Sequence, residues 1–367
     1  MKKNTINPSK QNECIFDLLP EASPTLQTEF KKQQPIKQET SIINTQDQTD
    51  KYGFKSQKEL KQKNDPKTLN ARIQKWRITI DLFDKQEKPD KKLLKNRTRK
   101  GIPDGFRNLA WPYLAGVPQA KIDSIIYLKC GKYEEFLKSQ EFNFEHQIRL
   151  DVLRTFPDNV NFQDQTVLSE SLVNVLKALS VAISDMGYCQ GLNFLTAALI
   201  MVTNDENAFW ILFRLMTKYN QAEKYKNPSS LLREFFILDC LINQYYPTTA
   251  KILKKNNIDL FYFATEWFIT LFASTLPIDL FYRVFEIFLL EGEKTLFRCA
   301  LAIIHFKEQK LIQLQNNFEI SLRHLKSLDD FFTIDNDQFI NVMFNKFKFS
   351  RQLIQQLEEK YKKQKKK

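Results

Sequence analysis

Glycine, cysteine and histidine are scarce in this chain of 367 residues, which has eight Gly, five Cys and three His. So few glycines, together with only 13 prolines, argue against a turn-rich β-sandwich or barrel and favour helices. The cysteines form no C-x-x-C pair and their number is odd, so neither a disulfide framework nor a zinc site is expected.

Long apolar runs are also missing. The longest uncharged stretches, near 187–203 and 267–278, are shorter than the roughly 20 residues that span a bilayer, or are interrupted by polar groups. The N-terminus carries charge but no apolar stretch after it, so no secretory signal is visible. We therefore expect a soluble, cytoplasmic protein of a reducing compartment.

The common signatures of nucleotide and hydrolytic sites are absent as well, since the chain has no GxxxxGK[ST] loop, GxGxxG turn, HExxH pair or GxSxG elbow. His146, His305 and His324 lie far apart, and we expect ordinary histidines rather than catalytic bases. Cys189 has no His neighbour in the sequence, which argues against a thiol nucleophile. We expect no metal ion and no cofactor bound by the chain itself.

Apolar residues make up 43% of the chain, with 31 Phe, 12 Tyr and 4 Trp, which is enough for a packed interior. The formal charge of +12 is uneven: +10 over residues 1–100, −2 over 101–354 and +4 over 355–367. A nearly neutral body argues against a nucleic-acid-binding core. The basic flanks predict at most a weak contact with anionic membranes.

Four regions follow from composition. Residues 1–66 are rich in Lys, Gln, Asn and Thr and predict a disordered leader. Residues 67–98 predict a short amphipathic helix, Leu69–Phe83, and then a basic linker with six positive charges over 91–100. Residues 99–348 predict an all-α domain, and 349–367 a basic tail that forms a frayed, solvated helix.

Within the domain, apolar positions recur at helical spacing and no sustained alternation predicts a sheet. Thr166 and Asn204 are candidate N-caps, and Gly292 is a candidate helix stop. Further helices are expected over 260–274, 278–290 and 296–314.

Three motifs stand out together: RxGIPxxxRxxxW over 99–111, IxxDxxRTFP over 148–157 and YCQGxN over 188–193. Their order and content resemble the TBC family, whose members activate Rab-type small GTPases. The resemblance covers roughly residues 99–310 and implies an all-α, V-shaped domain whose catalytic residues meet across a shallow groove. Where the family usually has Arg-Ile-Trp-Asp, this chain has Arg-Val-Phe-Glu at 283–286, which changes packing rather than the catalytic residues.

Arg154 suits catalysis of phosphoryl transfer because a guanidinium can bridge two phosphate oxygens, which a Lys cannot reproduce. It ends an apparent helix just before Pro157, so its side chain can project, and Asp151 lies three residues earlier, where it can orient the guanidinium. By resemblance, Gln190 is the second catalytic finger and would orient the attacking water. Tyr188, Gly191 and Asn193 would support it, with Gly187 and Gly191 letting the backbone approach the partner closely.

The resemblance implies a catalytic activator that acts in trans on a GTP-bound Rab, with GTP and Mg²⁺ carried by that partner and no substrate chemistry of its own. Recruitment to endomembranes would come through the Rab, in service of vesicle trafficking. Three alternatives stay open. Arg154 and Asp151 could form only a surface ion pair, the domain could be an adaptor that binds a Rab without accelerating hydrolysis, or the basic flanks could bind lipid or nucleic acid.

Overall fold

The computed structural model describes residues 49–55, 65–128, 132–139, 144–163, 166–314, 317–327 and 329–365. Throughout these ranges the regular structure is helical, and β pairing is limited to two isolated bridges, Thr49 with Lys55 and Phe54 with Asn159. The prediction of an all-α fold is confirmed. No helix in these ranges is long and apolar enough to cross a membrane.

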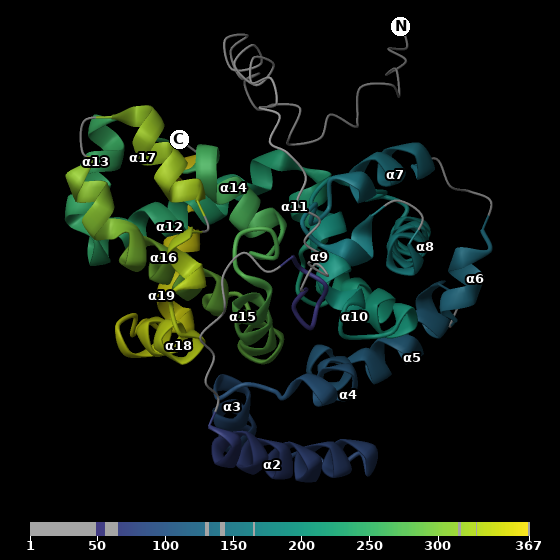
Figure 1. The fold of residues 1–367 in the computed structure, drawn as a ribbon. Coiled ribbons are helices and arrows are strands. Elements are labelled where there is room, and N and C mark those ends of the chain that lie inside the picture. The colour runs from purple at the N-terminus through teal and green to yellow at the C-terminus, as the bar shows by residue number, and fades with distance from the viewer. Residues whose placement is uncertain are drawn as a thin grey trace, which may run out of the picture.

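The helices form two groups that diverge from α15 (Ile278–Glu291), which lies between them (Figure 1). The first group comprises α4 (Asp104–Ala115), α5 (Val117–Leu128), α6 (Tyr133–Leu137), α7 (Glu145–Leu153), α8 (Val167–Ala182), α9 (Leu192–Ile200), α10 (Asp205–Thr217) and α11 (Ala222–Lys226). The second comprises α12 (Leu231–Tyr245), α13 (Pro247–Lys255), α14 (Phe261–Ile269), α16 (Lys294–Gln313), α17 (Phe318–Lys326), α18 (Asn336–Asn345) and α19 (Arg351–Lys365). Helix α15 contacts α4 of the first group and α16 and α18 of the second.

Helix boundaries agree with the sequence where a side chain or glycine marks them. The Thr166 hydroxyl accepts a hydrogen bond from the Ser169 amide at the start of α8, and the side-chain oxygen of Asn204 accepts one from the Asn207 amide at the start of α10. Gly292, with φ of +79°, ends α15. These caps satisfy backbone groups that a helix end would otherwise leave unpaired.

Helix α14 ends five residues before the predicted position, at Ile269 rather than Ser274. Leu271 and Phe272 adopt left-handed φ values of 49° and 71° there, and the Phe272 amide donates to the Trp267 carbonyl. This bond pattern is that of a helix end that normally requires glycine. No glycine stands at this position, so the sequence did not predict the stop.

The basic stretch predicted as a linker instead forms a helix, α3 (Lys91–Arg99), which packs on α15. Arg99 donates two hydrogen bonds to the Glu291 carboxylate at 2.6 and 2.7 Å, and Lys95 lies 3.3 Å from the same group. The preceding amphipathic helix is observed as α2 (Pro66–Asp84), which buries Trp76, Ile80 and Phe83.

The C-terminal tail is a helix, as predicted, but it is not merely a solvated end. Helix α19 packs on α12, burying Ile354, and Glu358 accepts a 2.8 Å hydrogen bond from Arg233. Its last three described charges, Lys362, Lys363 and Lys365, extend past these contacts.

Residues 49–55 belong to the stretch expected to be a disordered leader, yet the structure places them against the body, with Tyr52 only 6% exposed. The Asn159 and Asn161 side-chain amides both donate to the Tyr52 carbonyl, at 3.0 and 2.9 Å. The prediction for residues 1–48 and 56–64 lies outside the described residues.

Candidate functional site

Arg154 is the residue at which α7 ends, as the sequence predicted. Its backbone amide donates to the Asp151 carbonyl at 3.2 Å, closing the last turn of the helix. Its side chain is 53% exposed and forms an ion pair with Asp151 Oδ1, whose own side chain is 1% exposed. The guanidinium is therefore accessible while one of its nitrogens is fixed to a buried carboxylate.

The second oxygen of Asp151 accepts a hydrogen bond from the phenol of Tyr188. Burial is the main reason why the pKa of Tyr188 lies well above its usual value, and the nearby Asp151 carboxylate raises this pKa further. The phenol therefore stays protonated and acts as a donor. Asp151 thus links Arg154 to the segment that carries Gln190. Because each of its carboxylate oxygens pairs with a donor, the side chain of Asp151 is held in one rotamer.

A second hydrogen bond joins the same two segments on the other side of Gln190. The Asn193 side chain is fully buried; its nitrogen donates to the Thr155 hydroxyl at 2.7 Å, and its oxygen accepts from the Gly191 amide at 2.9 Å. Thr155 in turn donates to the Asp151 carbonyl at 2.6 Å. Gln190 is therefore bracketed by two residues that are both bonded to the end of α7.

The amide of Gln190 is free for another molecule. The residue is half-buried, and within the described ranges its side chain forms no hydrogen bond. Arg154 and Gln190 thus lie on two segments that one hydrogen-bonded platform joins, built from Asp151, Thr155, Tyr188 and Asn193. Sequence reasoning missed Thr155; its only signal was its place directly after Arg154.

The chain turns sharply after Arg154, where Phe156 adopts a φ of +46°. A left-handed backbone costs a bulky residue on the order of 1–3 kcal/mol and persists only when the surroundings enforce it. The ring of Phe156 is held edge-on by Phe54 and Phe194, each with its centroid 5.4 Å away. The predicted turn at Pro157 is present, and the aromatic contacts stabilise it.

Gly187 and Gly191 are required by the internal packing of the domain. Both are buried with positive φ, and a Cβ at Gly191 would lie 2.5 Å from Cγ2 of Ile269, while one at Gly187 would lie 2.7 Å from Cζ of Phe144. The close approach that they permit within the chain is to these side chains. The expectation that they also let the backbone approach a partner stays a prediction.

The first motif and the 283–286 segment contact each other inside the domain. Glu286 is fully buried and accepts hydrogen bonds from Arg107 at 2.8 Å and from the Ile102 amide at 3.0 Å. Phe285 packs against Trp111 with ring centroids 5.1 Å apart. The departures from the usual family residues thus occupy the packing and pairing positions, and Arg107 is the internal partner that the sequence indicated.

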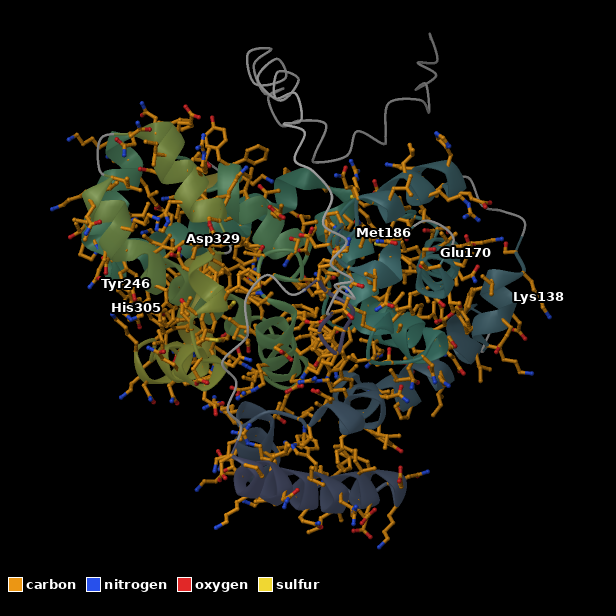
Figure 2. All side chains as sticks on the ribbon, in the orientation of Figure 1. Lys138, Glu170, Met186, Tyr246, His305 and Asp329 are labelled. Carbon is orange, nitrogen blue, oxygen red and sulfur yellow. The ribbon has the colours of Figure 1, made fainter. Side chains whose placement is uncertain are left out.

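An apolar surface lies beside Arg154 and was not predicted. Leu150 and Leu153 of α7 are 52% and 58% exposed, and Val167 at the start of α8 is 83% exposed. A hollow of about 120 Å³ separates the two helices and is lined in part by Leu150, Leu153 and Glu170. Glu170, marked in Figure 2, accepts a 3.0 Å hydrogen bond from Arg149 of α7.

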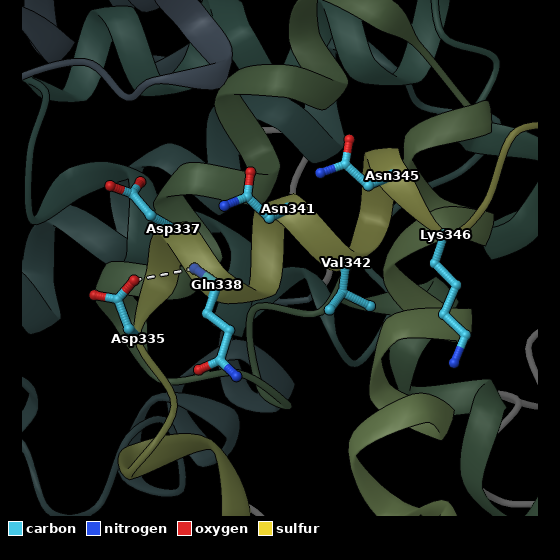
Figure 3. Close-up of a pocket in the computed structure, with 7 residues that line it drawn as sticks. All are labelled: Asp335, Asp337, Gln338, Asn341, Val342, Asn345 and Lys346. Carbon is cyan, nitrogen blue, oxygen red and sulfur yellow. Dashed lines mark hydrogen bonds between the residues drawn. The ribbon is translucent and has the colours of Figure 1, made fainter.

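Other features of the surface lie apart from this site. Tyr246 and His305, whose rings are 6.1 Å apart, lie in the second group of helices (Figure 2). A hollow of about 470 Å³ runs along α18, where the Gln338 amide donates to Asp335 (Figure 3). Its remaining lining is Asp337, Asn341, Val342, Asn345 and Lys346, with no candidate catalytic residue among them.

Comparison with known proteins decides the family. The model of the Rab-GTPase-TBC domain matches residues 104–312, more than half of the chain. The chain belongs to this family. Among proteins similar to this TBC chain, growth hormone-regulated TBC protein 1-A of Danio rerio is 30% identical over 283 residues, covering 75% of the chain and 77% of that protein.

Other relatives are longer. The human ecotropic viral integration site 5 protein homolog is 29% identical, covering 78% of this chain and 34% of its own length, and the Rab GTPase-activating protein eat-17 of Caenorhabditis elegans is 29% identical, covering 73% and 30%. The TBC chain thus spans about a third of the length of these relatives. The crystal structure of the Chlamydomonas flagellar RabGAP TBC domain shares the fold, with a TM-score of 0.66 and 24% identity over 81% of this chain and 99% of that one.

Proposed function

We propose that this TBC protein binds a GTP-loaded Rab-type GTPase and accelerates its GTP hydrolysis, with Arg154 and Gln190 as catalytic residues. The nucleotide and Mg²⁺ belong to the partner, and this chain acts on the reaction in trans. The observation that carries the proposal is the shared platform: the exposed guanidinium of Arg154 and the side-chain amide of Gln190 belong to two segments that Asp151 and Asn193 bond together.

Arg154 would offset negative charge on the phosphate oxygens. GTP hydrolysis passes through a loose transition state whose charge is spread over those oxygens, so a fixed cation lowers the barrier. A free Arg would have to lose side-chain entropy during the reaction. The ion pair to buried Asp151 restricts the side chain beforehand, which preserves more of its effect.

Gln190 would orient the attacking water. A carboxamide can accept a hydrogen bond from the water through its oxygen and donate one towards the γ-phosphate through its nitrogen. The backbone on both sides of Gln190 is fixed, since Tyr188 and Asn193 are buried and hydrogen-bonded. Only the side chain of Gln190 itself remains to be ordered.

A panel of GTP-loaded Rabs tests the function directly. Phosphate release is followed with and without the full chain, and acceleration of at least one Rab is expected. Stable binding to a GTP-loaded Rab without acceleration of any would favour the adaptor alternative, and neither binding nor acceleration would contradict both.

The apolar surface beside Arg154 provides a second, more specific expectation. Leu153→Ser removes a side chain that is 58% exposed and next to Arg154, so the folded state loses little buried area. If this surface contacts the GTPase, apolar area buried there contributes about 25 cal/mol per Å². The concentration of the protein that gives half-maximal stimulation should therefore rise, while the rate at saturation stays near that of the wild type.

Ile125→Ser is the matched control, because Ile125 of α5 is 60% exposed and lies outside the platform. Titrations of both variants against one responsive Rab make the comparison. Equal half-maximal concentrations for Leu153→Ser and wild type would show that the surface does not contact the partner.

Membrane recruitment would rest mainly on the Rab. Three of the six positive side chains at 91–100 already form contacts within the chain. Lys95 and Arg99 pair with Glu291, and Arg97 donates a hydrogen bond to Thr79 at 2.5 Å. The basic end of α19 lies away from α3, near the label of the C-terminus (Figure 1). We propose only weak contact of these separate flanks with anionic lipid.

A further inference from the structure

We propose that residues 49–55 position Arg154 through the loop that follows it, and so determine the rate of hydrolysis that the TBC domain supports. The inference rests on the proposed function for its effect on activity. The segment precedes the matched family region at 104–312 by about 50 residues of sequence, yet it contacts both the first motif and the chain directly after Arg154.

The segment is a compact turn with a defined geometry of its own. The Asp50 carboxylate accepts hydrogen bonds from the amides of Tyr52 and Phe54, both at 2.9 Å. The Asp50 amide donates to the Phe54 carbonyl at 2.8 Å, and Gly53 has a φ of +91°. A Cβ at Gly53 would lie 2.1 Å from Nδ2 of Asn161, so the turn is fitted tightly against the loop that follows Arg154.

One end of the turn is fixed to the domain framework. Lys51 pairs with Asp104 at 2.7 Å and with Asp279 of α15 at 3.1 Å. The Tyr52 phenol accepts a 2.9 Å hydrogen bond from Arg107, and its ring packs edge-on against Tyr282, with centroids 5.2 Å apart. This end is therefore attached to the buried Arg107–Glu286 pair rather than to mobile surface groups.

The other end is bonded to the loop after Arg154. The Lys55 amide donates to the Asp158 carbonyl, and the Val160 amide donates to the Gly53 carbonyl, both at 2.9 Å. The Phe54 ring contacts Phe156, the residue with left-handed backbone two positions after Arg154. Phe54 is one of three rings around Phe156, with Phe162 and Phe194 as the others.

Loss of these contacts should therefore act on catalysis through Arg154. Because Phe156 holds an unfavourable φ, it needs surrounding contacts to keep that conformation. Without Phe54 the turn can relax, and Arg154 moves from its fixed position relative to Gln190. A displacement of about 1 Å at a catalytic group can cost on the order of 100-fold in rate, while partner affinity from the remaining surface is kept.

Phe54→Ala in the full chain is the test, with Phe54→Tyr as the conservative variant. Phe318→Ala is the matched control, since Phe318 is a partly exposed ring that packs on Tyr262 in the second group of helices. Single-turnover hydrolysis by a responsive Rab gives the saturating rate and the half-maximal concentration. Hydrogen exchange reports the protection of residues 153–162.

We expect Phe54→Ala to lower the saturating rate by about 10- to 100-fold without changing the half-maximal concentration. Exchange should increase at 153–162, and Phe54→Tyr should retain most of the rate. Equal saturating rates for Phe54→Ala and Phe318→Ala, or unchanged exchange at 153–162, would overturn the proposal. If Phe54→Ala does not fold, Asn161→Ala, which removes the bond to the Tyr52 carbonyl, is judged by the same measurements.

The two proposals fail in different ways. If the wild-type chain accelerates no Rab, the proposed function is wrong, and the exchange measurement alone still decides whether residues 49–55 order the loop. If the wild type is active and the variants match the control, only the positioning proposal is wrong.

Discussion

Arg154→Lys should lower the stimulated rate of GTP hydrolysis by about 10³-fold or more, because an arginine supplied in trans contributes 10³ to 10⁵ in the GTPase systems for which it is known. Lys keeps the charge but lacks the planar fork, so it cannot bridge two phosphate oxygens or hold the same geometry against Asp151. Phosphate release at saturating protein concentration measures the effect.

Arg149→Lys is the control from the same helix. Arg149 lies on the exposed surface of α7 and is hydrogen-bonded to Glu145 of the same helix and to Glu170 of α8. Arg149→Lys makes the same substitution five positions before Arg154 and leaves the platform intact. The saturating rate of this variant should therefore remain near that of the wild type. Equal rates for Arg154→Lys and Arg149→Lys would remove Arg154 from the catalytic account.

Glu286→Gln should lower the free energy of unfolding by about 3 kcal/mol, because the buried Arg107 guanidinium loses its fully buried counter-charge and keeps only the half-exposed Asp104. Glu286 is fully buried beside Arg107, and burial, above all, raises the pKa of the Glu286 carboxyl, an effect that Arg107 opposes. Loss of the carboxylate leaves Arg107 with Asp104 and Tyr52 as its polar partners.

Urea denaturation measures this change. Glu319→Gln is the control, since Glu319 pairs with Arg323 at 2.9 Å on the surface, where such pairs contribute about 0–1 kcal/mol. A loss for Glu286→Gln no larger than that for Glu319→Gln would show that the buried pair does not hold the first motif to α15.

Local sequence signals predicted local structure well. Thr166, Asn204 and Gly292 cap helices where their side chains or backbone freedom indicated. The end of α14 at Ile269 was missed because Leu271 and Phe272 adopt a conformation that their own residue types disfavour, and tertiary packing enforces it. Helix propensity and spacing carry no information about such a site.

The resemblance named the residues of the site, but local spacing alone predicted only its short-range contacts. The pairing of Arg154 with Asp151 follows from their spacing of three residues on one helix. The hydrogen bonds from Tyr188 to Asp151 and from Asn193 to Thr155 join residues 37 and 38 positions apart, and the bond from Asn159 to Tyr52 spans 107. Contacts at such separations depend on how the helices pack, which no local pattern encodes.

The basic stretch at 91–100 shows the same limit for charge. A run of like charges usually predicts a solvated segment. Here Glu291, far along the chain on α15, accepts from Arg99 and faces Lys95, while the Arg99 guanidinium stacks on Phe344 at 3.6 Å. The pairing with Glu291 attaches α3 to α15, and only the tertiary structure reveals this contact.

The most direct test of two catalytic residues acting in trans compares two nucleotide states of a responsive Rab. Binding is measured to the Rab loaded with a non-hydrolysable GTP analogue and to the Rab loaded with GDP and aluminium fluoride, which mimics the transition state. The wild type should bind the second form at least about 100-fold more tightly, since a catalyst is complementary to the transition state. Gln190→Ala should lose most of that preference while keeping its affinity for the GTP-analogue form; an undiminished preference in Gln190→Ala would contradict the account.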